Sequence, residues 1–156
     1  MALILLGKTK CSLCGGVLSE GQEIVSFPPF VANRADPLCF FNDAAFHAMC
    51  FRSHPLAIKA EARFVELREK SSLGNRRCLV CRNRIENPDE YMGLPHLTDN
   101  PTAPAYEFNY AQFHRTCLKC WSGRKKVCQC LESLETSGQW VGPALEKILK
   151  EMRNLG

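Results

Sequence analysis

Eight cysteine and histidine side chains stand at spacings that metal sites use. Two Cys-x-x-Cys pairs are each followed, after 32 intervening residues, by His-x-x-Cys. The two resulting sets are Cys11, Cys14, His47 and Cys50, and Cys78, Cys81, His114 and Cys117. Zinc binds four thiolate and imidazole ligands in a tetrahedron, and Cys3His is a common closed set for structural zinc. The spacing therefore predicts two Zn2+ ions per chain, each bound by three thiolates and one imidazole.

The local geometry of each half-site explains the spacing. A Cys-x-x-Cys pair can turn tightly around a metal ion, and Gly15-Gly16 after the first pair suits a turn that ends with a positive φ. His-x-x-Cys is expected to place its two ligands on one face of the first turn of a helix. Disulfides or buried free thiols are the alternative interpretation of ten cysteines, and the duplicated spacing favours metal.

The two ligand sets belong to an internal repeat. A shift of 67 positions superposes all four ligand types without a gap, and it also matches non-ligand residues. These shared residues include the pairs Glu23/Glu90, Pro28/Pro95, Asn33/Asn100, Pro37/Pro104, Phe41/Phe108, Asn42/Asn109, Ala44/Ala111 and Phe46/Phe113. Self-similarity at a fixed period is the sequence signature of repeated structural units. We expect residues 1–74 to form zinc module one with a connector helix, and residues 75–156 to form zinc module two with a C-terminal helix.

The segments around the ligands indicate an α+β fold. "EGQEIVSFPPFV" and "PDEYMGLPHL" are typical of hairpin strands, and "PLAIKAEARFVELREKSSLG" predicts a connector helix with Ile58, Ala62 and Val65 on its apolar face. "GPALEKILKEMRNLG" predicts an amphipathic C-terminal helix, because its apolar residues recur at helical spacing. We expect its apolar stripe to pack on module two, with the docking of a partner as the alternative.

The order of knuckle, hairpin and ligand-bearing helix resembles a treble-clef zinc finger. "CSLCGG…FHAMCF" and "CLVCRN…FHRTCLKCW" resemble the first finger of a LIM domain over residues 11–50 and 78–120. The second zinc set of a LIM domain is absent from module one, where "FRSHPLAIKAEARF" contains no cysteine. The resemblance implies two tandem treble-clef-like modules, in which zinc replaces part of the hydrophobic core that so short a unit lacks.

Four cysteines lie outside the paired sets. Cys39 aligns with Tyr106 under the repeat shift, which favours an ordinary buried thiol. Cys120, Cys128 and Cys130 could contribute to a third zinc site, but no obvious fourth ligand lies nearby in the sequence. Ordinary thiols are therefore the expected interpretation, and a third site is the alternative.

Composition and charge indicate where in the cell the protein is expected and which class of partner it binds. The formal net charge is +4, which is lower than a dedicated nucleic-acid binder usually carries. The N-terminal "MALILLGKTK" lacks a basic n-region, and no apolar run approaches a membrane span. We therefore expect a cytoplasmic protein that keeps its thiols reduced and does not insert into a membrane.

The expected function is that of an adaptor or regulatory protein that binds another protein and has no catalytic activity. Aromatic residues between the ligands suit a protein interface. Nucleic-acid binding is the alternative, through basic clusters near module two at Arg76, Arg77, Arg82, Arg84, Lys119, Arg124, Lys125 and Lys126. A metal-dependent nuclease would need a catalytic histidine on the hairpin, where His96 is the only candidate; a surface histidine is the expected interpretation there.

Overall fold

The computed structural model describes residues 4–155, and its internal contacts divide the chain into two compact units. Unit one comprises Met1–Val31 and Asp36–Glu66, and unit two comprises Ala32–Ala35 and Leu67–Gly156. Both units combine helices with a small antiparallel hairpin, as the predicted mixed α+β class requires. The domain boundary expected between residues 74 and 75 stays a prediction.

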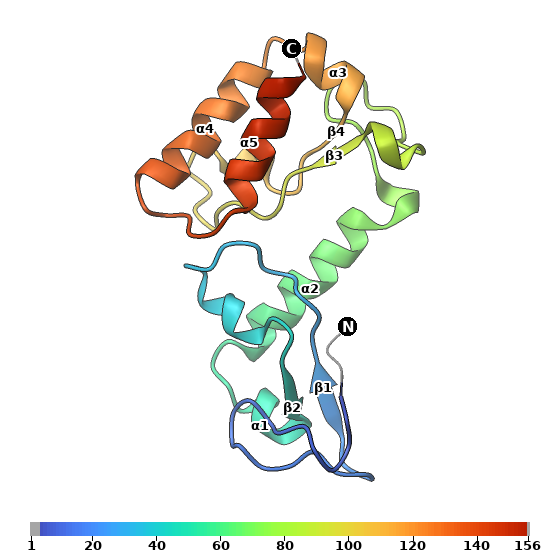
Figure 1. Cartoon of the computed structure of the whole chain (residues 1–156), viewed down its shortest axis with the longest axis vertical. Helices are drawn as coiled ribbons and strands as arrows, with labels where there is room; N and C mark the ends of the chain where they lie inside the picture. Colours follow the sequence, from blue (N-terminus) through green and yellow to red (C-terminus); the bar gives the residue numbers. More distant parts are fainter. Residues whose placement is uncertain (1–3, 156) are drawn as a thin grey trace. The chain divides into compact units, whose positions relative to one another are not determined.

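Unit one is built on a short hairpin and two helices (Figure 1). Strand β1 (Ile24–Ser26) pairs antiparallel with β2 (Ala45–His47), and Ile24 faces His47 in the register. Helix α1 (Ala48–Arg52) follows β2 without a break, and α2 (Ala57–Ser71) begins a few residues later. A 3-10 helix, η1 (Pro37–Phe41), precedes β2. The hairpin thus leads directly into α1.

Aromatic rings fill the interior of unit one. The Phe41 ring lies 5.6 Å from that of Phe46 and 5.8 Å from that of Phe51, and both pairs are tilted or edge-on. The Phe27 ring lies 5.3 Å from Phe51 and 5.4 Å from Phe64, a residue of α2. Ring pairs in these arrangements add to the stabilisation that burial alone provides. A few large side chains therefore form the core of a small unit.

The apolar face predicted for α2 differs from the face that the structure buries. Ala57 and Ala60 are buried, whereas Ile58 is 84% exposed and Val65 is 51% exposed. The prediction followed the helical spacing of the apolar residues, but the side of α2 that faces the core is the one that carries Phe64, whose ring lies 5.4 Å from that of Phe27, together with Ala57, Ala60 and Arg63. The spacing of the stripe was identified correctly and its burial was not.

Unit two repeats the hairpin and adds helices (Figure 1). Strand β3 (Tyr91–Gly93) pairs antiparallel with β4 (Gln112–His114), and α3 (Arg115–Cys120) follows β4 directly. Two longer helices come next, α4 (Arg124–Thr136) and α5 (Ala144–Asn154). Three 3-10 helices complete the unit: η2 (Leu73–Asn75), η3 (Pro88–Glu90) and η4 (Tyr106–Phe108). The sequence analysis predicted no helix at α4.

Unit two has a mainly aliphatic core. Helices α4 and α5 pack on each other and on the hairpin through buried leucines, together with Met152 and Trp140. Leu145, Leu149 and Met152 of α5 are buried in this cluster, and Ile148 and Leu155 pack against it. The apolar stripe predicted for the C-terminal helix therefore faces the interior of unit two. Among the described residues, no helix is long and apolar enough to cross a membrane.

The 67-residue shift also relates backbone features of the two units. The register Ile24↔His47 becomes Tyr91↔His114, and the isolated bridge Lys10↔Val17 becomes Arg77↔Arg84. Asn42 and Asn109 make equivalent hydrogen bonds, in which each side chain accepts from two consecutive backbone N–H groups and donates to one carbonyl. The frame around each ligand set is therefore built in the same way.

Candidate metal centres

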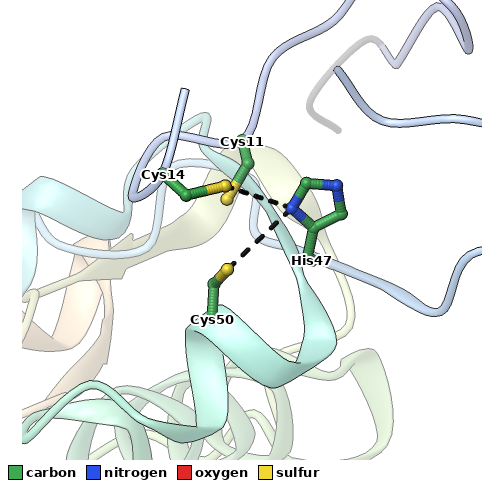
Figure 2. A group of neighbouring side chains, drawn as sticks. All are labelled: Cys11, Cys14, His47 and Cys50. Carbon is green, nitrogen blue, oxygen red and sulfur yellow. Dashed lines mark hydrogen bonds between the residues drawn. The ribbon is translucent and has the colours of Figure 1, made fainter. Parts of the chain in front are cut away.

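The structure brings the eight predicted ligands together in two groups. Cys11, Cys14, His47 and Cys50 form the first, and Cys78, Cys81, His114 and Cys117 form the second. Figure 2 shows the first group, in which the three thiols surround the imidazole nitrogen Nδ1 of His47. Within residues 4–155, no further group of metal-ligating side chains is gathered in this way.

Backbone hydrogen bonds shape the turn that carries the first pair of thiols. The N–H of Gly15 donates to the carbonyl of Cys11, and the N–H of Cys11 donates to the carbonyl of Gly16. Gly15 has a φ of 72°, as the sequence predicted for the end of this turn. The N–H of Ser12 donates to the carbonyl of Ala45, which ties the turn to β2. The turn therefore holds its thiols next to the strand that ends in His47.

The histidine of each group lies at the end of a strand rather than within a helix. His47 is the last residue of β2 and has an extended backbone, with φ −60° and ψ 137°, and His114 ends β4 in the same way. Cys50 and Cys117 then fall in the helices that follow. The predicted placement of both ligands on one helical turn was thus wrong for the histidine. Pairing with β1 or β3 fixes the backbone from which each imidazole projects.

A hydrogen bond to the far ring nitrogen orients the imidazole of the first group. His47 Nε2 lies 3.3 Å from the carbonyl oxygen of Val17, so Nε2 carries the proton and donates it. The lone pair of Nδ1 is then free for a metal ion, and Nδ1 is the nitrogen that faces the thiols. Metal-bound histidines commonly donate their second N–H to a carbonyl or carboxylate in this way.

Donor separations in both groups match one tetrahedral ion. A Zn2+ ion about 2.3 Å from sulfur and about 2.0 Å from nitrogen sets its donors roughly 3.5–3.8 Å apart. His47 Nδ1 lies 3.3 Å from Cys14 Sγ and 3.9 Å from Cys50 Sγ. His114 Nδ1 lies 3.4 Å from Cys81 Sγ and 4.0 Å from the Cys117 sulfur. All the donors of a group lie within 4.8 Å of one another, so each group fits zinc.

The thiols of each group divide into acidic and weakly acidic ones. Burial raises the pKa of Cys11, but backbone N–H donors outweigh burial and lower the pKa from 9.0 to about 6. The same opposition lowers the pKa of Cys78 to about 6. Hydrogen bonding to the Cys14 sulfur raises the pKa of Cys50 to about 11, and burial, with its neighbouring thiols, raises that of Cys117 to about 11.

Negative charge crowded into a small space contributes to the two raised pKa values, beside hydrogen bonding for Cys50 and burial for Cys117. The lowered pKa of Cys11 and of Cys78 favours the charged form of each thiol, and that charge makes ionisation of the next thiol less favourable. A divalent cation at the centre removes this repulsion, and each thiol that coordinates it loses its proton. The donor chemistry of both groups therefore suits a dication such as Zn2+.

The remaining cysteines and histidines lie outside both groups. Cys120 is exposed, Cys128 and Cys130 are half-buried on α4, and the structure does not gather them into a metal-binding group. Cys39 is half-buried near the side-chain amide of Asn42. His96 lies beside Asp99, with Nε2 3.3 Å from Oδ1, and its ring is 5.6 Å from that of Tyr110. The alternative third zinc site thus has no assembled ligand set among the described residues.

The sequence analysis missed residues that support the sites from outside. Asn42 and Asn109 fix the loop that leads to each ligand-bearing strand through three hydrogen bonds each. Their identity under the repeat shift was visible in the sequence, and a repeated asparagine beside a phenylalanine is the signal that could have found them. Comparisons with protein families, with curated proteins and with solved structures gave no match for this chain.

Proposed function

We propose that the chain is a zinc-stabilised adaptor or regulatory protein, which binds another protein and has no catalytic activity of its own. Two features support this function: closed metal centres and an exposed apolar stripe on α2. The stripe is the observation that carries the proposal.

Both centres are suited to a structural role. Each offers four protein donors, which fill the tetrahedron of Zn2+ and leave no position for water or substrate. A catalytic zinc keeps one position open. The order of turn, hairpin and helix around each centre supports two copies of a treble-clef-like module, similar to the first finger of a LIM domain. Zinc would then hold together units whose strands are only three residues long.

The exposed stripe on α2 gives a candidate contact surface. Ile58, Ala62 and Val65 are spaced at i, i+4 and i+7, so they share one side of the helix, and all three are exposed. Ile58 is 84% exposed, although isoleucine is among the most frequently buried residues. An apolar helical face that the unit's own core leaves uncovered is the kind of surface that fits a partner protein.

Ion pairs reduce the basic character of unit two and favour a protein partner over nucleic acid. Lys126 pairs with Glu107, and Arg115 Nη2 lies 3.1 Å from Glu151 Oε2. The guanidinium of Arg76 lies over the Tyr91 ring, 4.3 Å from its centre. Cations engaged in this way are less available for phosphates of a polyanion.

The test uses an extract of the cells from which the protein comes. It compares the proteins captured by the intact chain with those captured by a variant that carries both Ile58→Glu and Val65→Glu. We expect a defined partner that remains bound at high salt and is lost from the variant, because an apolar contact is insensitive to screening. Val141→Glu is the control, since Val141 is about as exposed as Val65 but belongs to unit two. Capture that Val141→Glu removes equally would contradict the proposed surface.

Retention on duplex DNA across a salt series tests the alternative function. The adaptor proposal expects weak retention that ends at moderate salt. Micromolar or tighter binding with a steep salt dependence, together with no protein partner, would instead establish nucleic-acid binding. Zinc analysis accompanies both experiments and should find two ions per chain, one for each Cys3His group.

A further inference from the structure

A basic cavity lies beside the metal centre of unit two. It has a volume of about 290 Å³, and its lining includes Lys70 from the end of α2 and both Arg77 and Arg82 from the Cys-x-x-Cys turn. Gln112 of β4 and Asn109 add amide groups to the lining. The cavity is therefore lined by three cationic residues, by neutral hydrogen-bonding groups and by one carboxylate, that of Glu107.

The three cations are not neutralised by the protein. Within residues 4–155, the side chains of Lys70, Arg77 and Arg82 form neither ion pairs nor hydrogen bonds. Glu107 is the carboxylate in the lining, and it pairs with Lys126. Three like charges around one cavity repel one another, and an anion inside it relieves that repulsion.

Arg82 occupies a backbone conformation that its side chain disfavours. Its φ is 65°, and its counterpart in the other turn is Gly15, with φ 72°. A residue with a Cβ has a cost of about 1 kcal/mol or more in this left-handed region, which glycine adopts freely. Unit one shows that glycine suits the turn. The presence of arginine at this strained position points to a role for its cation, since Arg82 lines the cavity.

A buried amide holds two of the cationic residues in place. Gln112 is only 7% exposed. Its Oε1 accepts a hydrogen bond of 3.1 Å from the backbone N–H of Arg77, and its Nε2 donates to the carbonyl of Lys70. The corresponding residue of unit one is Ala45, which has no side chain that could make these bonds. The arrangement is thus a feature of unit two and is not required by the metal centre.

We propose that this cavity binds a phosphate group on a phosphorylated side chain of the partner protein. A phosphorylated side chain carries close to two negative charges at neutral pH and three acceptor oxygens, which three cations can engage. The volume of about 290 Å³ exceeds that of one phosphate group, so it can admit the phosphate together with the side chain that carries it. A continuous polyanion fits less well, because Glu86, Asp89 and Glu90 lie on the segment that leads into β3. The inference rests on the proposed protein-binding function.

The test uses free phosphoserine, phosphotyrosine and inorganic phosphate as probes of the full zinc-loaded chain, followed by amide NMR. Saturable shifts are expected at Arg77, Arg82 and Gln112. Arg82→Gly should weaken binding about tenfold or more, the loss of one charge-assisted contact, while the chain keeps its zinc and thermal stability. Lys125→Gln is the control, because it removes an exposed cation that does not line the cavity.

Several outcomes would overturn the inference. No saturable shift, or affinity that Arg82→Gly and Lys125→Gln reduce equally, would show that only general positive charge acts. An equal response to inorganic sulfate would reduce the cavity to an unspecific anion site. Tighter binding of oligonucleotides than of phosphoserine would replace the phosphoprotein with nucleic acid. If phosphate binding fails while capture through Ile58 and Val65 persists, this inference alone is wrong and the adaptor function stands.

Discussion

The two units enclose the same kind of metal centre in different interiors. Both place a Cys-x-x-Cys turn against a strand that ends in histidine, and both fix the preceding loop with an asparagine. Unit one then fills its interior with the rings of Phe27, Phe41 and Phe51. Unit two uses aliphatic side chains from α4 and α5. The two units share the turn, strand and asparagine that position the donors, but they differ in the side chains that form the core.

This difference indicates which parts of the module the metal constrains. Each donor atom must lie within a few tenths of an ångström of its ideal distance from the metal. The turn, the strand end and the loop clamp, by which we mean the asparagine Asn42 or Asn109 that fixes the preceding loop, therefore recur in both units. A core needs suitable volume and apolar character, and several combinations of side chains satisfy it. The comparison predicts that shared residues contribute equally to both units, and that core residues and metal removal affect the units unequally.

Removal of one zinc ligand should have the largest effect on stability, and unit one should be destabilised more than unit two. Cys14→Ser and Cys81→Ser are each expected to reduce the zinc content from two ions to one. A structural zinc contributes roughly 10–16 kcal/mol of apparent binding free energy in small fingers. Unit one has a core of a few phenylalanine rings and no counterpart of α4 and α5, so it should lose amide protection throughout. In Cys81→Ser, α4 and α5 should keep partial protection through their leucine contacts.

Hydrogen exchange and metal analysis measure this difference, with Cys120→Ser as the control because that thiol is exposed and outside both groups. The control should bind two zinc ions and exchange like the original chain. Complete loss of protection in α4 and α5 of Cys81→Ser would show that unit two depends on its metal as strongly as unit one. Retention of both ions by either ligand variant would disprove the ligand assignment.

The sequence was sufficient for features that depend on local spacing. The eight ligands, the positive φ of Gly15 and the paired strands follow from residues a few positions apart or from the repeat. The stripe Val127, Leu131 and Leu134 has the helical spacing that could have indicated α4. The buried face of α2 could not be predicted, because the rings of Phe27 and Phe30 that Phe64 packs against come together only in the folded unit.

Phe41 and Phe108 correspond under the repeat shift, and substitution of each should destabilise its unit by a different amount. Phe41→Leu removes ring contacts with Phe27, Phe46 and Phe51, and we expect it to lower the free energy of unfolding of unit one by about 3 kcal/mol. Phe108→Leu should have an effect of about 1 kcal/mol, because leucine fits an aliphatic core and Phe108 has no ring partner among the described residues. Denaturant unfolding of the zinc-loaded chains provides the measurement.

Equal effects of these two substitutions would show that the cores do not differ in the way proposed. Phe40→Leu is a suitable control within unit one, since this ring is about half exposed. Its effect should remain below that of Phe41→Leu.

The loop clamp should behave alike in both units. Asn42→Ala and Asn109→Ala each leave two backbone N–H groups and one carbonyl without their partner, and we expect a loss of about 2 kcal/mol in either unit. Asn42→Asp keeps the acceptor oxygen and should recover part of the loss. Asn83→Ala serves as the control, because that side chain is exposed and its effect should stay below about 0.5 kcal/mol. Strongly unequal losses would contradict a shared frame.

The smallest expected effect on stability concerns Gly15 and Arg82, which occupy the same position in the two Cys-x-x-Cys turns. Gly15→Arg should destabilise unit one by about 1 kcal/mol, because a Cβ is introduced at a φ of 72°. Arg82→Gly relieves the same strain at a φ of 65°, but it also adds freedom to the unfolded chain. These terms oppose each other, so the stability of unit two should stay unchanged or rise by up to about 1 kcal/mol. Thermal unfolding of the two variants, compared with Lys125→Gln, measures the asymmetry. A clear loss of stability in Arg82→Gly would mean that the arginine stabilises the turn itself, and the argument that it is retained for its cation would then fail.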